Sequence, residues 1–155
     1  MVAWVNKYLD VPFLERGRDR NGVDCWGLVR LVLMEQFGIN VPRYDDEYMS
    51  TSENELLAGI VERERGGWVS VEPGEEQCGD VVLLAITGFP CHVGIVVDDG
   101  MMLNARNGVG IAVESYRRPF WNRRVRGFFR HRDMWVWTTT GVPLFEYRDA
   151  EPCIG

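Results

Sequence analysis

Several features that would assign this chain to a familiar class of protein are absent. The sequence has no run of 18 or more apolar residues, so it predicts no membrane-spanning helix and no membrane insertion. Its first eight residues lack the charged and apolar regions of a secretory signal. The net charge is −6 and no nucleic-acid-binding motif occurs, so nucleic acid is not an expected partner.

Histidine and lysine are also scarce. The chain has two histidines, and it has one lysine against sixteen arginines. Four cysteines occur, but none are in a CxxC pair, and with two histidines they form no metal-ligand pattern. We therefore expect no metal and no cofactor. A protein made in the cytoplasm would keep all four cysteines as thiols.

What is present fits one compact domain. A chain of 155 residues with 46% hydrophobic residues can bury one ordinary core. We expect this core within residues 1–133, and residues 134–155 read as an aromatic arm or tail of the same domain. The tail has two interpretations, a final packed strand with a frayed end or an arm whose tryptophans dock onto a neighbouring subunit.

The order of the expected elements indicates an α+β fold. Helical patterns come first, followed by short apolar and β-branched runs. This order predicts helices packed against a central antiparallel sheet. The expected helices cover about 2–9, 24–37 and 52–65, and the expected strands cover about 80–86, 92–98, 101–106, 109–114 and 125–131.

Cys25 lies where a turn becomes an amphipathic helix. Asp24 is a residue type that caps helix starts, and apolar residues recur at helical spacing after it. The first turn of a helix favours negative charge, so the thiol pKa is expected to fall there and make Cys25 a nucleophile. The alternative is a buried, inert cysteine.

A nucleophilic cysteine needs a base, and His92 is the first candidate. It opens an apolar run, 91–97, that predicts a buried strand. A turn at 98–100 with glycine at its end then leads into the return strand 101–105. The alternative is that His92 is a satisfied core residue. His131, near the end of an alternating strand pattern, is the second choice of base.

Asn104 is the expected orienting residue for this base. If Val97 pairs with Met101 across the turn, Asn104 falls on the same face as His92, within side-chain reach. An amide oxygen there can accept the imidazole N–H and leave the other ring nitrogen free for the thiol proton. Cys25, His92 and Asn104 would then form a Cys-His-Asn triad of the papain sort.

Four short sequence boxes carry a resemblance to a known family. They occur in the family's order and span about residues 10–130, so together they are far more specific than any one alone. The chain resembles the NlpC-type cell-wall cysteine peptidases, in particular the short branch found among phage tail proteins. The matching boxes are Asp24-Cys25-Trp26-Gly27-Leu28-Val29, Gly38-Ile39-Asn40-Val41-Pro42-Arg43, Cys78-Gly79-Asp80-Val81-Val82 and His92-Val93-Gly94-Ile95.

This resemblance implies a fold, a reaction and a setting. It implies a papain-like NlpC-type fold and hydrolysis of peptidoglycan stem peptides at the bond between D-glutamate and the diamino acid. The residues alone indicate only amide or ester acyl transfer. A phage tail component is made in the host cytoplasm and delivered to the wall in the virion, so it needs no export signal. The expected partners are a peptidoglycan stem peptide and other tail-tip or hub proteins.

The resemblance also assigns substrate contacts, and the chain departs from the family pattern at three positions, one of which is Asn104, where the family commonly has a histidine. Asp24 is expected to meet the free amine of the substrate, and Arg18 a carboxylate. Trp26 replaces the family's serine and should reshape the substrate contacts. Phe13 stands where the family often has a tyrosine that helps to stabilise the oxyanion, so that donor must come from elsewhere, such as the Cys25 backbone N–H.

The charges are unevenly distributed. Residues 45–80 carry eleven acidic residues, whereas residues 117–132 carry seven arginines and no acidic residue. The arginine-rich segment is interpreted either as a solvated face or as a surface for carboxylate-rich peptidoglycan or an acidic tail protein. Two other functions remain open, a structural tail-tip or tail-assembly protein that keeps the peptidase fold with little activity, and an acyltransferase on the same scaffold.

Overall fold

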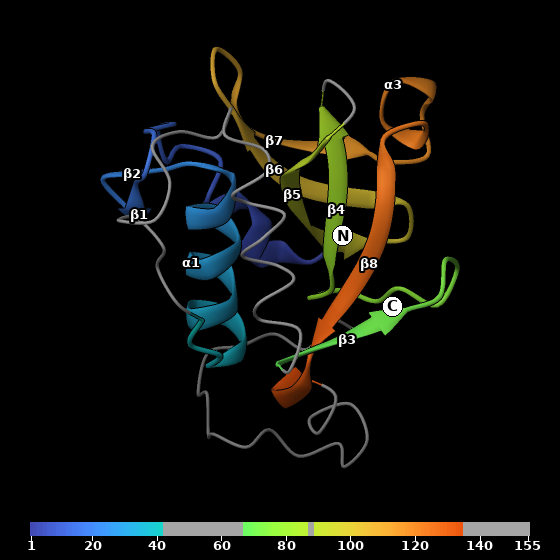
Figure 1. The fold of residues 1–155 in the computed structure, drawn as a ribbon. Coiled ribbons are helices and arrows are strands. Elements are labelled where there is room, and N and C mark those ends of the chain that lie inside the picture. Colours follow the sequence, from blue (N-terminus) through green and yellow to red (C-terminus); the bar gives the residue numbers. More distant parts are fainter. Residues whose placement is uncertain (42–66, 87–88, 135–155) are drawn as a thin grey trace.

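The structure is a computed structural model that describes residues 1–41, 67–86 and 89–134, with the side chains of 89–91 left out (Figure 1). It confirms the α+β fold, with one long helix against an antiparallel sheet. The sheet has six strands in the order β3-β8-β4-β5-β6-β7. None of the helices in the described ranges is long and apolar enough to cross a membrane. The elements are η1 (Ala3–Lys7), β1 (Arg18–Asp19), β2 (Gly22–Val23), α1 (Cys25–Phe37), β3 (Trp68–Val71), β4 (Val81–Ile86), β5 (Phe89–Asp98), β6 (Met101–Arg106), β7 (Gly110–Ser115), α3 (Pro119–Asn122) and β8 (Val125–His131).

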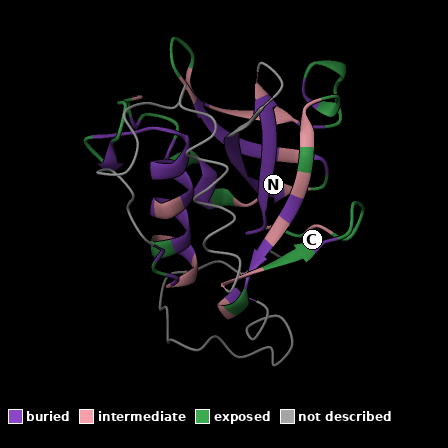
Figure 2. Cartoon of the chain, viewed as in Figure 1, coloured by how far each residue is buried: buried purple, intermediate pink, exposed green. Residues whose placement is uncertain are grey.

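Helix α1 begins and ends at the signals that the sequence provides. The Asp24 carboxylate accepts a hydrogen bond from the N–H of Gly27 at 2.8 Å, which caps the start of the helix. Gly38 ends it in the left-handed conformation at φ 66°, where glycine has no steric penalty. Most of the helix is buried, as Figure 2 shows, because the sheet covers one side and the N-terminal segment packs against it as well.

The sheet has a separate apolar cluster on each face. Side chains alternate between the two faces of a strand. On β5 and β6, odd-numbered residues such as Val93 and Leu103 pack in the cluster that contains α1. Even-numbered residues such as Val96 and Met102 pack with Trp121 of α3 on the other face. His92 and Asn104 are even-numbered residues of these same strands.

The β5–β6 hairpin has the register that the sequence predicts over most of its length. Ile95 pairs with Leu103, and Val96 pairs with Met102. At the turn the prediction is wrong, because Met101 pairs with Asp98 instead of Val97 through a bulge. The bulge lies at the turn end of the hairpin, so it leaves the register of the paired residues nearer His92 and Asn104 unchanged.

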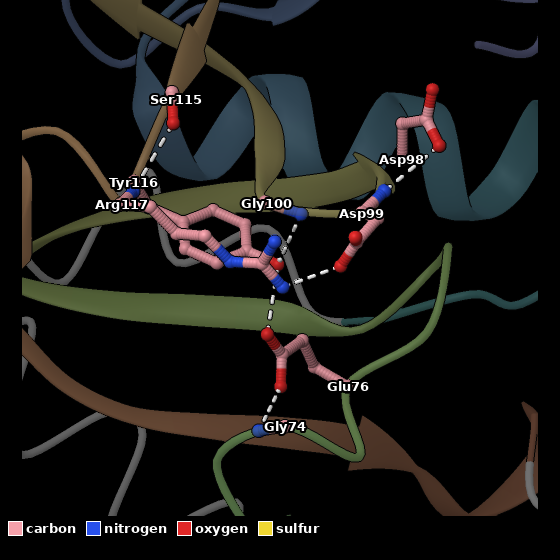
Figure 3. A network of polar contacts seen from close by, with 8 residues as sticks. All are labelled: Gly74, Glu76, Asp98, Asp99, Gly100, Ser115, Tyr116 and Arg117. Atoms are coloured by element: carbon pink, nitrogen blue, oxygen red, sulfur yellow. Dashed lines mark hydrogen bonds and ion pairs between the residues drawn. The ribbon is translucent and has the colours of Figure 1, made fainter.

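A network of polar contacts holds this turn (Figure 3). The Gly100 N–H donates to the hydroxyl of Tyr116 at 3.1 Å, and that hydroxyl donates to Glu76 at 2.9 Å. Arg117 forms an ion pair with Asp99 on the outer side of the turn. The loop before β4, the β5–β6 turn and the segment after β7 are therefore tied together.

A buried ion pair joins the start of β4 to β8. Arg130 donates from Nε and Nη2 to the two carboxylate oxygens of Asp80, each at 2.8 Å. The Asp80 side chain is fully buried, and it also accepts from the N–H of Gln77. Asp80 belongs to one of the sequence boxes that carry the family resemblance, and its role here is to fix the neighbouring strands.

Several sequence expectations differ from the structure. The N-terminal helix is a short 3-10 helix at Ala3–Lys7, and the sequence did not predict β1, β2 or β3. Cys78 is disulfide-bonded, so the expectation that all four cysteines stay as thiols is wrong, whereas Cys25 is a free thiol. The helix expected at 52–65 lies outside the described residues, as does the arm expected at 134–155 apart from its first residue.

Candidate active site

The first candidate side chain is the Cys25 thiol at the start of α1. It is buried, with 1% of the residue exposed. The backbone N–H groups of Val93 and Trp26 form hydrogen bonds to this thiol. Val93 directly follows His92 on β5, so the sulfur lies against the strand that carries the expected base, whereas the His92 ring stacks on Trp121, which belongs to the cluster on the other face of the sheet.

Burial dominates the protonation of Cys25. It raises the pKa of the thiol to about 12, and the nearby Asp24 carboxylate raises it further. The N–H groups of Val93 and Trp26 and the charge of Arg18 act in the opposite direction. The expectation that the helix start lowers this pKa is therefore wrong, because desolvation outweighs the effect of the helix end. The thiol is protonated at neutral pH.

His92 and Asn104 come together as the sequence predicts. Nε2 of His92 lies 3.1 Å from Oδ1 of Asn104. The imidazole is 4% exposed and stacks on the indole of Trp121, with ring centres 5.4 Å apart and planes 10° from parallel. Burial lowers the pKa of His92 to about 4, the hydrogen bond to Asn104 opposes this, and the charge of Arg106 lowers it further. The ring is therefore neutral at neutral pH.

Three neighbours of this pair were missed by sequence reasoning. Glu114 of β7 accepts from Asn104 Nδ2 at 2.8 Å, and Arg106 donates to the other oxygen of Glu114 at 2.8 Å. Trp121 covers the imidazole. A register for β6 and β7 would have placed Glu114 near Asn104. No local pattern identified Trp121, because its segment was interpreted as arginine-rich surface.

Asp24 and Arg18 form a buried ion pair with each other. Arg18 Nη1 lies 2.7 Å from Asp24 Oδ1, and both side chains are fully buried. Asp24 also accepts from the backbone N–H groups of Gly27 and Arg16. In this structure the pair fixes the chain that precedes α1. Their roles as substrate contacts stay predictions that require these side chains to become accessible.

The other predicted site residues are placed less directly. Trp26 is buried in the core beside Cys25, with 2% of the residue exposed. Phe13 forms a backbone bridge with Val23 next to the helix start and is half-buried. His131 contacts Trp68 edge-on at 5.1 Å on β8. Strands β4 and β5 separate β8 from β6, so the second-choice base is not brought to Asn104.

A cavity of about 410 Å³ is lined in part by residues that contact the His92–Asn104 pair or its partners. The wall of this cavity includes three residues that contact the pair or its partners, namely Trp121, Arg106 and Glu114. Arg118 and Phe120 add another charged and another aromatic side chain to the same wall. Within residues 1–41, 67–86 and 89–134, no three His, Cys, Asp or Glu side chains gather closely enough to hold a metal ion. The predicted site residues Cys25, His92 and Asn104 supply a thiol, an imidazole and an amide.

The structure packs a cysteine at the start of a buried helix against an antiparallel sheet. Two neighbouring strands of that sheet carry the histidine and the asparagine. This is the arrangement of a papain-like fold. Residues 10–130 match the model of the NlpC/P60 family, and the chain belongs to that family. The match covers Cys25, His92 and Asn104, whereas His131 lies just beyond its end.

Curated relatives and solved structures agree with this assignment. The chain is 29% identical over 108 residues to the murein DD-endopeptidase MepS/murein LD-carboxypeptidase of Escherichia coli, covering 70% of this chain and 49% of that protein. It is 24% identical over 140 residues to the gamma-DL-glutamyl hydrolase of Bacillus subtilis, covering 88% of this chain and 30% of that protein. The chain thus spans half or less of the length of these two relatives. An NlpC/P60 family protein from Bacillus cereus has the same fold, with a TM-score of 0.61 at 22% identity over 82% of this chain and 37% of that one.

Proposed function

We propose that the chain is a cysteine peptidase that hydrolyses an amide bond in peptidoglycan stem peptides. The observation that carries the proposal is the meeting, at Val93, of the Cys25 thiol with the strand that holds the His92–Asn104 pair. Membership of the NlpC/P60 family supports it, as does the name of the Escherichia coli relative, a murein endopeptidase.

The proposed bond joins D-glutamate to the diamino acid of the stem peptide. The name of the Bacillus subtilis relative, a gamma-DL-glutamyl hydrolase, supports a glutamyl bond. The alternative bonds within the stem peptide use the same acyl-transfer chemistry. The products released from purified peptidoglycan distinguish among them, because each bond leaves a fragment of different mass.

In the proposed reaction, Cys25 Sγ attacks the carbonyl carbon of the scissile amide while His92 accepts the thiol proton. The C–N bond then breaks, and His92 donates this proton to the leaving amine. Water then attacks the thioester with His92 again as general base, the C–S bond breaks, and His92 returns the proton to the Cys25 sulfur as the carboxylic acid product leaves. Asn104 orients the imidazole throughout. The Cys25 backbone N–H is the proposed donor to the oxyanion, because Phe13 offers no hydroxyl.

The resting pair in this mechanism is a thiol beside a neutral imidazole. Burial raises the pKa of Cys25 and lowers the pKa of His92, so a preformed thiolate and imidazolium are both disfavoured. The proton must therefore move as the sulfur attacks, which makes His92 a general base in the transition state. Activity should be lost as His92 becomes protonated at low pH.

The proposed setting is a phage tail, in which the protein acts on the host cell wall during entry. Trp26, at the position beside the nucleophile, fits the phage-tail branch. Tail-tip or hub proteins are the proposed partners, with residues 134–155 as the docking arm of a peptidase domain at 1–133. In the arginine-rich segment, Arg117 and Arg130 already pair with Asp99 and Asp80.

A structural tail protein with little activity is the second candidate function. The observation that favours it is the burial of Cys25, which leaves 1% of the residue exposed. A substrate could reach this sulfur only if the surrounding segments move. The two candidates differ in whether purified protein cleaves peptidoglycan at all.

A zymogram on purified peptidoglycan tests the proposal. Wild type should clear the gel, whereas Cys25→Ala should not. The variant should still have the circular dichroism spectrum and the unfolding curve of wild type. Ser70→Ala, at an exposed position on β3, is the control and should clear the gel as wild type does. Equal clearing by Cys25→Ala would refute the catalytic assignment. No clearing by wild type would favour the structural function.

A further inference from the structure

The Asn104 side chain has partners at both ends of its amide. At one end, Nε2 of His92 lies 3.1 Å from Oδ1. At the other, Nδ2 lies 2.8 Å from Oε2 of Glu114 and 3.3 Å from the carbonyl oxygen of Ala112. Asn104 is 1% exposed, so water cannot readily replace any of these partners.

The two partners of Nδ2 settle which end of the amide is which. A carboxylate and a backbone carbonyl only accept hydrogen bonds, so the group that faces them must be the donating NH₂. Arg106 donates to Oε1 of Glu114 at 2.8 Å and so holds the carboxylate in place as an acceptor. The amide oxygen of Asn104 must then face His92. This orientation follows from the partners and does not depend on telling N from O directly.

The orientation of Asn104 determines the tautomer of His92. An amide oxygen can only accept, so Nε2 of the neutral ring must carry the hydrogen. Nδ1 then has the free lone pair that can take a thiol proton. If the amide were reversed, its NH₂ would donate to Nε2, the hydrogen would move to Nδ1, and the ring could not accept a proton from that side.

We propose that Glu114 is a positioning residue that fixes the orientation of Asn104 and, through it, the catalytic tautomer of His92. This inference rests on the proposed peptidase function for its effect on rate, but not for its effect on the tautomer. The plain alternative is that the Arg106–Glu114 pair only stabilises the β6–β7 hairpin. That alternative predicts a loss of stability without a change of tautomer.

The substitution Glu114→Gln distinguishes the proposed positioning role from the purely structural one. Arg106 can only donate, so it should hold the glutamine oxygen and turn the glutamine NH₂ toward Asn104. Asn104 then reverses to accept from it and presents NH₂ to His92. Glu114→Ala removes the carboxylate but leaves the Ala112 carbonyl, which still favours the original orientation. The more conservative change is therefore expected to be the more damaging.

The experiment combines kinetics with ¹⁵N NMR of the histidine rings. For Glu114→Gln we expect kcat to fall on the order of 100-fold with little change in KM, because a mispositioned general base loses an effect of roughly that size or more. For Glu114→Ala we expect less than about a 10-fold fall. Glu72→Gln, at an exposed position, is the matched control and should equal wild type. His92→Phe identifies the His92 signals.

The NMR arm keeps the inference testable without activity. Wild type should show the hydrogen of His92 on Nε2, and Glu114→Gln should show a population with it on Nδ1. Wild type with the hydrogen on Nδ1, or Glu114→Gln with an unchanged tautomer, would overturn the inference. Equal rate losses in Glu114→Gln and Glu114→Ala, tracking a fall in melting temperature, would overturn it in favour of the structural alternative. An inactive wild type with the predicted tautomers would count against the peptidase function alone.

Discussion

Lowering the pH should destabilise the folded protein through His92. The ring has an ordinary pKa of 6.5, and burial lowers it to about 4 in the folded protein. Between these values the unfolded chain binds a proton that the folded protein does not, so the free energy of unfolding falls as the pH falls. The contribution is fully present above the unfolded pKa and is lost progressively down to the folded one.

The size of this effect follows from the two pKa values. Each pKa unit corresponds to about 1.4 kcal/mol, so lowering the pH from about 7 to about 5 should cost about 2 kcal/mol through this one residue. The matched variant is His92→Phe, which keeps a flat ring against Trp121 but cannot titrate. Its lost hydrogen bond to Asn104 lowers stability by an amount that does not depend on the protonation of an imidazole.

Urea unfolding of both proteins at the two pH values measures the effect. The quantity of interest is the change in unfolding free energy from about pH 7 to about pH 5 in wild type, minus the same change in His92→Phe. We expect this difference to be about 2 kcal/mol, with wild type losing more. If the two proteins lose the same free energy, His92 is not buried as a neutral ring and the reasoning about the resting site is wrong.

Two substitutions test the contacts that position the site. Asp80→Asn removes the charge opposite Arg130 in a buried ion pair and should lower the unfolding free energy by about 3 kcal/mol in urea titrations. Asp99→Asn, in an exposed ion pair, should change the unfolding free energy by less than about 1 kcal/mol. Similar losses in the two variants would contradict this expectation. Gly27→Ala places a Cβ 1.9 Å from the carbonyl oxygen of Gly17. The substitution should therefore lower the unfolding free energy by about 3 kcal/mol or prevent folding. A melting temperature equal to that of wild type would show that the helix start is not packed this tightly.

The sequence predicts the parts of the site that depend on local patterns. The Asp24 cap and the apolar spacing after it place Cys25 at the helix start, which the structure confirms. The twelve-residue separation of His92 and Asn104 around a short turn brings them together. Both results depend on residues close together in the chain, where periodicity and turn chemistry are informative.

The features that the sequence did not predict depend on distant segments. The pKa of Cys25 rises because the sheet buries the thiol, an effect that the helix start alone does not reveal. Glu114 reaches Asn104 only through the β6–β7 register. Trp121 contacts His92 from helix α3, which follows β7 in the chain. Strand β3 is short and largely exposed, and it pairs with residues of β8 that lie far along the chain, so its local pattern was weak.

The central claim is that Cys25 and His92 act together as nucleophile and base. The most direct measurement is intact-mass and peptide-mapping analysis of protein treated with a stem-peptide analogue that carries a chloromethyl ketone at the scissile position. We predict a single adduct on Cys25 in wild type, forming far more slowly in His92→Phe. An adduct on another residue, or equal rates in the two proteins, would contradict the claim.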